Sequence, residues 1–508
     1  MSDKYLNRNS VIKSASLLMV GTIFSKFLGF LRELMVAYKY GSGIISDSFV
    51  LTNGVPDILF SAIGIAISIN FIPCYTRIKG NEERDRFTSN LLNISVLILL
   101  GGSIFTAIFP KTVLILFASG LNDQAEYIST LMLRIVIFSC IPIMLSSMFQ
   151  AYCQANGEFL TTAVCGSVIN VIIIAFIIIS SSDSYYLLSI GTLFGYFVGM
   201  LIPLYGMKKI GFHYYRICSF REDSIRMLII LTAPLLIENI ASNLSLLVDR
   251  NLASYLDSGT ITGLSYAGNI TNIASTMIAS AIITATFPLF SRLIAGGQQE
   301  QFFSQFERYA SAISYILAPI SVFMIFNAGD IVRFIFEHGA FTSSATKIVS
   351  ESVVCYAVGV LPMGLQSYMI RGFYAMQDTK TPVKIKVFAL FCNIILNLIT
   401  VRFIQHKGIA LSTSVSYIIA FFLLTRSLKK KHGIDNIGEI TKEGGLSLLL
   451  SIIPCVLIYL LFNHFFTIKF PILKLLAEGV LFVLSYGMMM TIFRRSIMES
   501  IVKVFKRT

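Results

Sequence analysis

The sequence predicts an all-α polytopic membrane protein with about fourteen transmembrane helices. Of its 508 residues, 55% are hydrophobic and only 13% are charged, and the mean hydropathy is +0.76. A water-soluble protein of this size needs a largely polar surface and could not bury so much apolar material. A membrane span needs about 20 apolar residues, so each long apolar run is expected to cross the bilayer.

The expected spans follow one another with short linkers that leave no room for a soluble domain. The first apolar run begins near Val11 and lacks a small-residue cleavage site, so we interpret it as a retained helix and not as a signal peptide. The expected spans are 12–38, 46–74, 88–116, 127–152, 159–181, 184–206, 226–255, 261–291, 308–334, 347–374, 383–401, 408–427, 444–463 and 471–493.

The net charge of +13 is concentrated in the linkers that follow even-numbered spans. In a soluble protein this charge would suggest nucleic-acid binding, but its position here follows the positive-inside rule and predicts that both termini are cytoplasmic. The linker 402–407 is the exception, since it carries Arg402 and Lys407 on the expected outer side. The basic residues behind this assignment include Arg77, Lys79, Arg84, Arg86, Lys208, Lys209, Arg216, Arg221, Lys380, Lys384, Lys386, Lys429, Lys430 and Lys431.

An internal repeat is indicated by two pairs of similar segments. The polar turn at 371–382 has a weaker copy at 150–160, and the segment 32–49 resembles 250–266. The repeat predicts two six-helix lobes with the same membrane orientation, the arrangement of a parallel-repeat transporter. We expect an N-lobe at 1–207, a cytoplasmic basic linker at 208–225, a C-lobe at 226–427, and two extra helices with a tail at 428–508.

Charged residues inside the expected spans are the first candidates for function, because such charges are costly in a membrane and usually face a cavity or a partner. Cations in a membrane cavity suit an anionic group such as a phosphate or pyrophosphate. The alternative is that they reach toward the membrane surface or pair locally, as Arg32 would with Glu33 or Asp47. The candidates are Lys26, Arg32, Asp47, Arg134 and Arg250.

A second candidate site is rich in oxygen ligands. Asn393 and Asn397 lie one turn apart, and with Thr413 and Asp249 they would suit a hard monovalent cation. The alternative is ordinary hydrogen bonding between helices. The five histidines are scattered, and the chain has no CxxC, HExxH, GxSxG or P-loop motif, so no catalytic centre is expected.

The opening of the chain resembles the MurJ (MviN) family of the MOP exporter superfamily. The resemblance rests on Ser25-Lys26-Phe-Leu-Gly29-Phe-Leu-Arg32-Glu33, on Gly41-Ser-Gly43 with Asp47-Ser-Phe49, and on Phe71-Ile-Pro73. It continues through Leu133-Arg134-Ile135, Phe336-Glu337-His-Gly339-Ala-Phe341, Arg371-Gly-Phe-Tyr374-Ala375, Asp378-Thr-Lys-Thr-Pro382 and Gly408-Ile-Ala-Leu-Ser-Thr413, and it covers nearly the whole chain.

This resemblance implies a flippase that moves lipid II, the undecaprenyl-pyrophosphate-linked peptidoglycan precursor, across the bacterial plasma membrane by alternating access. It implies substrate contacts at Lys26, Arg32 and Asp47, a lipid-tail groove along the last two spans, and a sodium site at Asp249, Asn393, Asn397 and Thr413. Asn397 stands where the family has an acid. Cell-wall synthesis or division proteins are the expected protein partners.

Two positions depart from the family pattern. The family's Pro-Asn-x-x-Arg reads Pro56-Asp57-Ile-Leu-Phe60, and its Ala-Asn/Asp-Arg reads Ala267-Gly268-Asn269, so two cavity arginines are absent. Asn269 is kept as a cavity residue, and Arg250 is a candidate replacement for the missing charge. A flippase for another polyprenyl-linked saccharide, a cation-coupled drug antiporter, a membrane enzyme and a scaffold protein remain alternatives.

Overall fold

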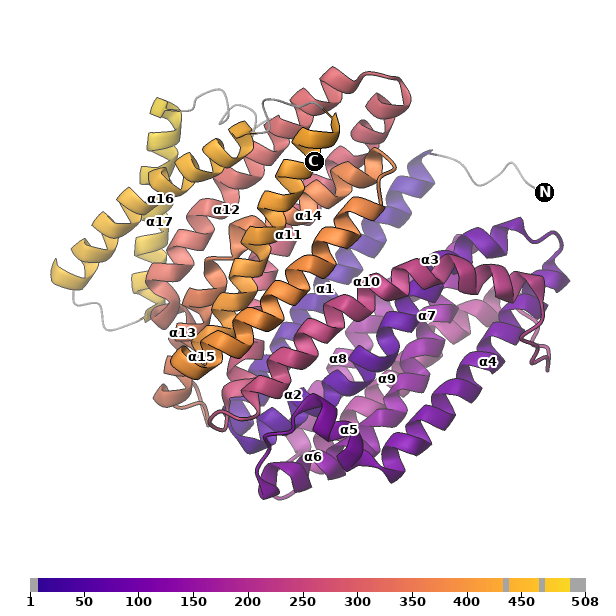
Figure 1. The fold of residues 1–508 in the computed structure, drawn as a ribbon. Coiled ribbons are helices and arrows are strands. Elements are labelled where there is room, and N and C mark those ends of the chain that lie inside the picture. The colour runs from indigo at the N-terminus through magenta and orange to yellow at the C-terminus, as the bar shows by residue number, and fades with distance from the viewer. Residues whose placement is uncertain (1–7, 433–437, 466–470, 494–508) are drawn as a thin grey trace. The chain divides into compact units, whose positions relative to one another are not determined.

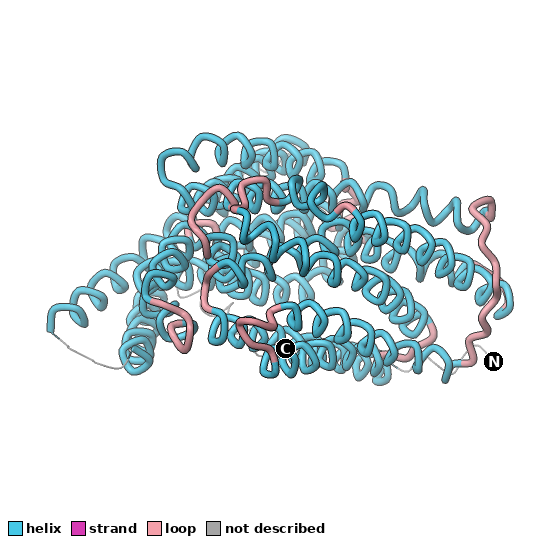
Figure 2. The backbone as a smooth tube through the Cα atoms, turned by 90° about the horizontal axis from the view of Figure 1, so that it is seen from below, coloured by secondary structure: helices cyan, strands magenta, loops and turns pink. Residues whose placement is uncertain are grey.

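The computed structural model describes residues 8–432, 438–465 and 471–493, and these are almost entirely helical, with no strand among them (Figures 1 and 2). Helices are expected because a backbone in lipid must satisfy its own hydrogen bonds. The chain forms two compact units, Met1–Ile261 and Thr262–Thr508. The prediction of an all-α membrane protein is confirmed.

The first unit contains α1 through α10. Its helices are α1 (Arg8–Tyr40), α2 (Ile44–Pro56), a π-helical turn (Asp57–Ser61), α3 (Ala62–Arg77), α4 (Asn81–Ile108), α5 (Pro110–Phe117), α6 (Asp123–Val136), a 3₁₀ turn (Ile137–Ser139), α7 (Cys140–Ala155), α8 (Leu160–Ile179), α9 (Tyr186–Ile210) and α10 (Asp223–Ala253). Helix α10, which the repeat assigned to the C-lobe, therefore belongs to the first compact unit.

The second unit contains the remaining helices. These are α11 (Thr260–Ala295), whose first two residues precede the boundary, α12 (Gln299–Phe336), α13 (Ser343–Ala357), α14 (Val360–Ala375), α15 (Lys380–His432), α16 (Gly438–Phe465) and α17 (Pro471–Phe493). The expected boundaries at residues 207, 225 and 427 describe the repeat and stay a prediction.

Several expected spans are broken or joined. Among the described residues, nine helices are long and apolar enough to cross a membrane, and the pair α13 and α14, bent by 47°, would make ten. Helix α15 contains two expected spans, joined where Ile404 and Gln405 leave the helical conformation. The expected count of fourteen spans is not confirmed and stays a prediction.

Small residues let the helices of the first unit approach closely. On α9, Gly191, Gly195 and Gly199 recur every four residues and face α8, where a Cβ at Gly195 would lie 3.1 Å from the Ile169 carbonyl oxygen. On α1, a Cβ at Gly21 would lie 2.5 Å from the carbonyl oxygen of Ala163 on α8. Such stripes are typical of membrane helices, whose association depends on close packing.

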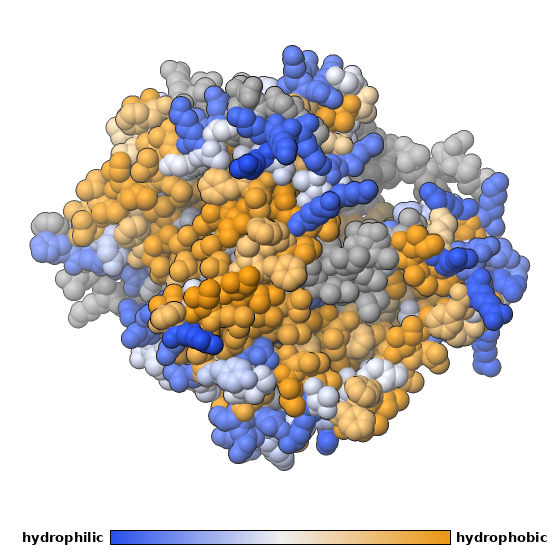
Figure 3. All heavy atoms as spheres, in the orientation of Figure 1, coloured by the Kyte–Doolittle hydropathy of each residue, from blue (hydrophilic) through white to orange (hydrophobic). Residues whose placement is uncertain are grey.

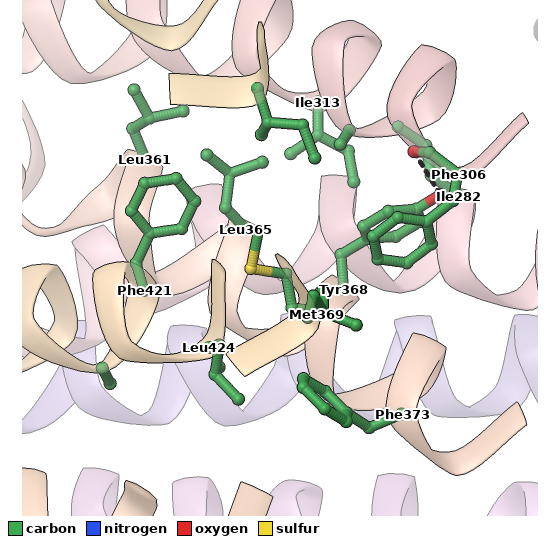
Figure 4. Packing of buried hydrophobic residues seen from close by; sticks show 14 of the residues in the cluster. Ile282, Phe306, Ile313, Leu361, Leu365, Tyr368, Met369, Phe373, Phe421 and Leu424 are labelled. Carbon is green, nitrogen blue, oxygen red and sulfur yellow. Dashed lines mark hydrogen bonds between the residues drawn. The ribbon is translucent and has the colours of Figure 1, made fainter. Parts of the chain in front are cut away.

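The second unit has a large apolar core between α11, α12, α14 and α15 (Figure 4). Within it, the Tyr368 ring stacks on Phe306 at a centroid distance of 4.7 Å. The Tyr368 hydroxyl donates a hydrogen bond of 3.1 Å to the Phe306 carbonyl oxygen, which satisfies its only polar group away from water.

Polar contacts attach α16 and α17 to α12. Lys474 on α17 lies 2.7 Å from the Asp330 carboxylate on α12 and donates to the Asn463 side chain on α16. Toward the other end of the helices, the Tyr315 hydroxyl donates to the Glu443 carboxylate at 2.6 Å. These contacts hold α17 to α12 near Lys474 and α16 to α12 near Glu443.

The basic segment between α9 and α10 lies extended along α4. Asn90 and Asn93 bind its backbone through their side-chain amides, and the backbone N–H of His213 donates to the Asp85 carboxylate at 3.0 Å. The side chains of Lys208, Lys209 and Arg216 remain exposed. The expected linker is thus a fixed segment that presents basic side chains.

Much of the surface drawn in Figure 3 is hydrophobic, with hydrophilic side chains gathered in separate groups. Helix α15 contributes a stripe at helical spacing, made of Phe388, Phe391, Ile395 and Leu398, all exposed. Exposed apolar stripes of this kind are expected where helices face lipid.

The two polar turns that indicated the repeat have the same structure. After α7, Gly157 is left-handed, and the Glu158 side chain accepts hydrogen bonds from the N–H and hydroxyl of Thr161. After α14, Gln377 is left-handed, and the Asp378 side chain accepts the same pair of bonds from Thr381. This shared geometry supports the interpretation of the two segments as copies.

We predict that Asp378 stabilises the protein in a defined pH range. Partial burial raises the pKa of Asp378, but hydrogen bonds from Lys431 and Thr381 outweigh it and lower this pKa to about 2. Because the folded pKa lies below the unfolded value of about 3.9, the stabilisation is present above that value and is lost as the pH falls toward 2. Asp378→Asn should flatten the fall of the melting temperature between about pH 5 and about pH 3, where the unfolded-state carboxyl takes up its proton.

The matched control is Asp183→Asn, which changes an exposed carboxylate in the loop between α8 and α9. This variant should keep the pH dependence of the parent protein. An unchanged pH dependence in Asp378→Asn would contradict the prediction.

Candidate functional site

Arg32 and Asp57 bring opposite charges together in the first unit. Arg32 lies half-buried on α1, and its charge acts on the carboxylate of Asp57, at the end of α2. Tyr196 on α9 lies within electrostatic reach of both. Lys26, also on α1, is exposed. The sequence suggested Glu33 or Asp47 as a local partner of Arg32. The structure adds the charge of Asp57, at the end of α2.

Asp57 begins a π-helical turn directly after Pro56. A π-helical turn departs from the regular α-helical hydrogen-bond pattern and is frequent at functional sites. Asn243 on α10 donates a hydrogen bond of 3.1 Å to the carbonyl oxygen of Ile58 in this turn. The turn leaves the Asp57 side chain exposed, although it follows a largely buried helix.

Arg250 reaches α2 from α10. Its guanidinium lies directly over Gly54, where a Cβ would come within 2.5 Å of the Arg250 Cζ. The carboxylates of Asp57 and Asp249 both act on its charge. The Nη1 atom is buried and has no hydrogen-bond partner among the described atoms. Arg32, Asp57 and Arg250 therefore form one charge cluster from three helices.

Asp47 connects α2 to the loop before α11. It is 6% exposed, and its carboxylate accepts a hydrogen bond of 2.6 Å from the backbone N–H of Gly259. Ser42 donates to the Gly259 carbonyl oxygen at 2.8 Å. Gly259 has φ of +92° and a Cβ there would lie 2.8 Å from the Ser42 carbonyl oxygen, so this position requires glycine.

The other predicted substrate contacts lie on two further helices, α6 and α11. Arg134 is exposed near the end of α6, and Asn269 is half-buried on α11 in the second unit. Phe60 packs into the apolar clusters of the first unit, and its ring lies 3.2 Å from where a Cβ of Gly102 on α4 would stand. Position 60 is therefore an apolar packing position in this chain.

Three of the four predicted sodium ligands lie together in the second unit. Asn397 donates to the Asn393 side-chain oxygen at 3.2 Å, and Asn393 donates to the Thr413 hydroxyl at 3.4 Å. Both asparagines are buried, and their amide and hydroxyl oxygens are the donor type that a hard cation prefers. Asp249, the fourth, belongs to the first unit. No group of three or more His, Cys, Asp or Glu suited to a metal occurs in the described part of the chain.

Sequence reasoning did not place Gly54 in the site, and it treated Asp57 only as a departure from a pattern. Asp57 carried a usable signal, since an acid within an apolar span demands a partner. Gly54 carried none, because its importance depends on the approach of α10. The contact between Asp47 and Gly259 was equally invisible, since it joins residues far apart in the sequence.

The long apolar helices define a multi-pass membrane protein, and opposite charges inside such helices are typical of membrane transporters. The chain belongs to the MurJ family, because the family model described as "Lipid II flippase MurJ" matches residues 36–480. Lys26 and Arg32 lie just before the matched region. The resemblance stated from the sequence is thereby confirmed.

Similar proteins agree with this assignment. The chain is 26% identical over 435 residues to a probable lipid II flippase MurJ of Vibrio cholerae serotype O1, covering 82% of this chain and 83% of that protein. It is 27% identical over 423 residues to a lipid II flippase MurJ of Thermosipho africanus, covering 83% of this chain and 86% of that protein.

Solved structures show the same fold. A lipid II flippase MurJ in an inward closed conformation matches with a TM-score of 0.84 and 27% identity, covering 95% of this chain and 99% of that chain. An inward-facing MATE multidrug transporter of the MOP superfamily matches with a TM-score of 0.67 and 12% identity, covering 82% of this chain and 96% of that chain. The second likeness shows the fold alone.

We predict that Asp47 is needed for stability through its bond to Gly259. Asp47→Asn removes a buried charge-assisted hydrogen bond, which should cost about 1.5–3 kcal/mol of stability. The measurement is the melting temperature of the purified variant, together with its lipid binding per folded molecule. A normal melting temperature combined with lost lipid binding would instead support the substrate contact expected from the sequence.

Proposed function

We propose that this chain is a flippase that moves lipid II from the inner to the outer leaflet of the bacterial plasma membrane by alternating access. The observation that carries the proposal is the family match over residues 36–480 in a chain of apolar helices. The chain is a transporter and not an enzyme. The positions of the basic linkers support cytoplasmic termini.

The headgroup of lipid II carries a pyrophosphate, and the cations of the first unit suit it. Lys26 is exposed, and the charges of Arg32 and Arg250 both act on the Asp57 carboxylate. Guanidinium groups bind phosphate oxygens in pairs, which favours arginine at such a site. Arg134, Asp47 and Asn269 stay predictions as substrate contacts.

The apolar tail of the lipid would lie along α16 and α17. Helix α17 carries an exposed apolar stripe made of Leu473, Leu476, Val480 and Leu484. Any helix that faces lipid carries such a stripe, so the stripe alone does not distinguish the cargo. The presence of α16 and α17 beyond the predicted repeat favours a lipid-linked cargo over the drug antiporter, because a small soluble drug needs no groove for a lipid tail. Protein partners in cell-wall synthesis or division stay a prediction.

A flippase for another polyprenyl-linked saccharide is the second candidate. Phe60 and Asn269 are neutral where the family pattern has arginines, and Asp57 adds a negative charge. These changes lower the positive charge available to a pyrophosphate. Only an experiment can distinguish lipid II from another polyprenyl-linked saccharide, because both carry the same tail and a similar phosphate group.

The proposal is tested by complementation in a bacterium depleted of its resident lipid II flippase. The membrane level of the expressed chain is checked by immunoblot. We expect growth and extracytoplasmic lipid II to be restored. Lysis at a normal membrane level, together with a different polyprenyl-linked saccharide copurifying with the protein, would favour the second candidate.

Lys26 variants in the same strain test its role as a cation. If its positive charge receives the headgroup, Lys26→Arg should keep activity, whereas Lys26→Gln should lose at least about tenfold, since a charge-assisted bond contributes about 1.5–3 kcal/mol. Extracytoplasmic lipid II per unit of membrane protein is the readout. Full activity of Lys26→Gln would rule out the role.

We also propose that transport is coupled to Na⁺ through the oxygen cluster of Asn393, Asn397 and Thr413. Because Asn397 is fully buried within this cluster, Asn397→Asp would add a negative charge beside the ion. The variant should gain more thermal stability than the parent protein when KCl is replaced by NaCl at equal ionic strength. An identical response to both salts in parent and variant would contradict the coupling site.

A further inference from the structure

We propose that Gly54 and Asp57 are positioning residues for Arg250: Gly54 provides the space in which the guanidinium lies, and Asp57 is the counter-charge that an anionic headgroup replaces. This inference rests on the proposed function. In this inference, Arg250 on α10 replaces the cation that is missing at Phe60 of the second span. Gly54 and Asp57 are added to the headgroup site.

The first argument is steric. The guanidinium of Arg250 occupies the place where any side chain at position 54 would begin, since even the Cβ of an alanine would lie 2.5 Å from its Cζ. Gly54 itself is buried within α2. A methyl group there must displace the flexible end of Arg250 and leaves the helix backbone as it is. Position 54 therefore controls where the charge of Arg250 lies.

The second argument is electrostatic. Arg250 is half-buried, and its neighbours include two carboxylates, Asp57 and Asp249. Asp57 also interacts with Arg32, so one carboxylate serves two guanidinium groups. A dianionic phosphate group offers more negative charge and more acceptor oxygens than one carboxylate. It is therefore able to replace Asp57 as the partner of both arginines.

The third argument concerns access. The Asp57 side chain is exposed at the π-helical turn, whereas Nη1 of Arg250 is buried and has no hydrogen-bond partner among the described atoms. The charge of Asp57 thus acts on a cation with unused donor capacity.

The arrangement also explains how the chain tolerates Phe60. Because Phe60 packs against α4 in apolar clusters, the position cannot hold a charge without a partner. Arg250 on α10 instead places a cation over Gly54, six residues before Phe60 in the sequence, and its charge interacts with Asp57. The proposed cargo is still a phosphate-bearing polyprenyl lipid, and Arg250 of α10 supplies the positive charge that binds it.

The test measures binding of undecaprenyl pyrophosphate to the purified full chain in detergent. The variants are Gly54→Ala, Arg250→Gln, the double variant and Asp57→Asn. The control is Gly101→Ala on α4, where a Cβ meets nothing within 4 Å. Melting temperatures are recorded for all of them, so that loss of folding is recognised.

Gly54→Ala and Arg250→Gln should each weaken binding by about tenfold, the effect expected when one charge-assisted contact is lost. The double variant should be no weaker than Arg250→Gln alone, because both changes remove the same contact. Asp57→Asn should bind more tightly, since the carboxylate that acts on both arginines no longer competes with the lipid. A purely structural role of Asp57 would not tighten binding.

The inference is overturned if Gly54→Ala binds like the parent protein, if its effect adds to that of Arg250→Gln, or if Asp57→Asn weakens binding. In those cases the parent protein still binds the lipid and the proposed function stands. Absence of binding by the parent protein, with Gly101→Ala behaving alike, would overturn the function and the inference together.

Discussion

A charge inside an apolar helix needs an opposite charge, a hydrogen bond or water, because the membrane interior offers no other compensation. In the first unit this constraint brings α1, α2 and α10 together, since Asp57 interacts with both Arg32 and Arg250. In the second unit Lys474 meets Asp330 in the same way and holds α17 to α12. The interior charges thus attach α17 to α12, and they supply the headgroup site that we propose.

The remaining helix contacts depend on the absence of side chains. Gly191, Gly195 and Gly199 allow α8 and α9 to pack closely, and Gly54 provides the place for the Arg250 guanidinium. Glycine is costly in a helix because of its conformational freedom. Its repeated use here is consistent with membrane helices, whose association depends on close packing more than on a hydrophobic driving force between them.

The apolar runs of the sequence were sufficient for the fold class, because each long run reports directly on the membrane, and the motifs of the opening segments were sufficient for the family. Its limits appear where distant residues meet. The Asp57 and Arg250 charges lie in different apolar runs, and nothing in either run shows that they share a site. The contact of Asp47 with Gly259 depends on two turns approaching each other. The membership of α10 in the first unit likewise follows from long-range packing.

Transport of lipid II itself is tested most directly in proteoliposomes that contain the purified chain and lipid II in both leaflets. An impermeant reagent that modifies the headgroup measures how quickly lipid II from the inner leaflet becomes accessible outside. The account predicts that this rate rises in proportion to the amount of protein and falls in Arg250→Gln. A rate equal to that of protein-free vesicles, with correctly folded and inserted protein, would contradict it.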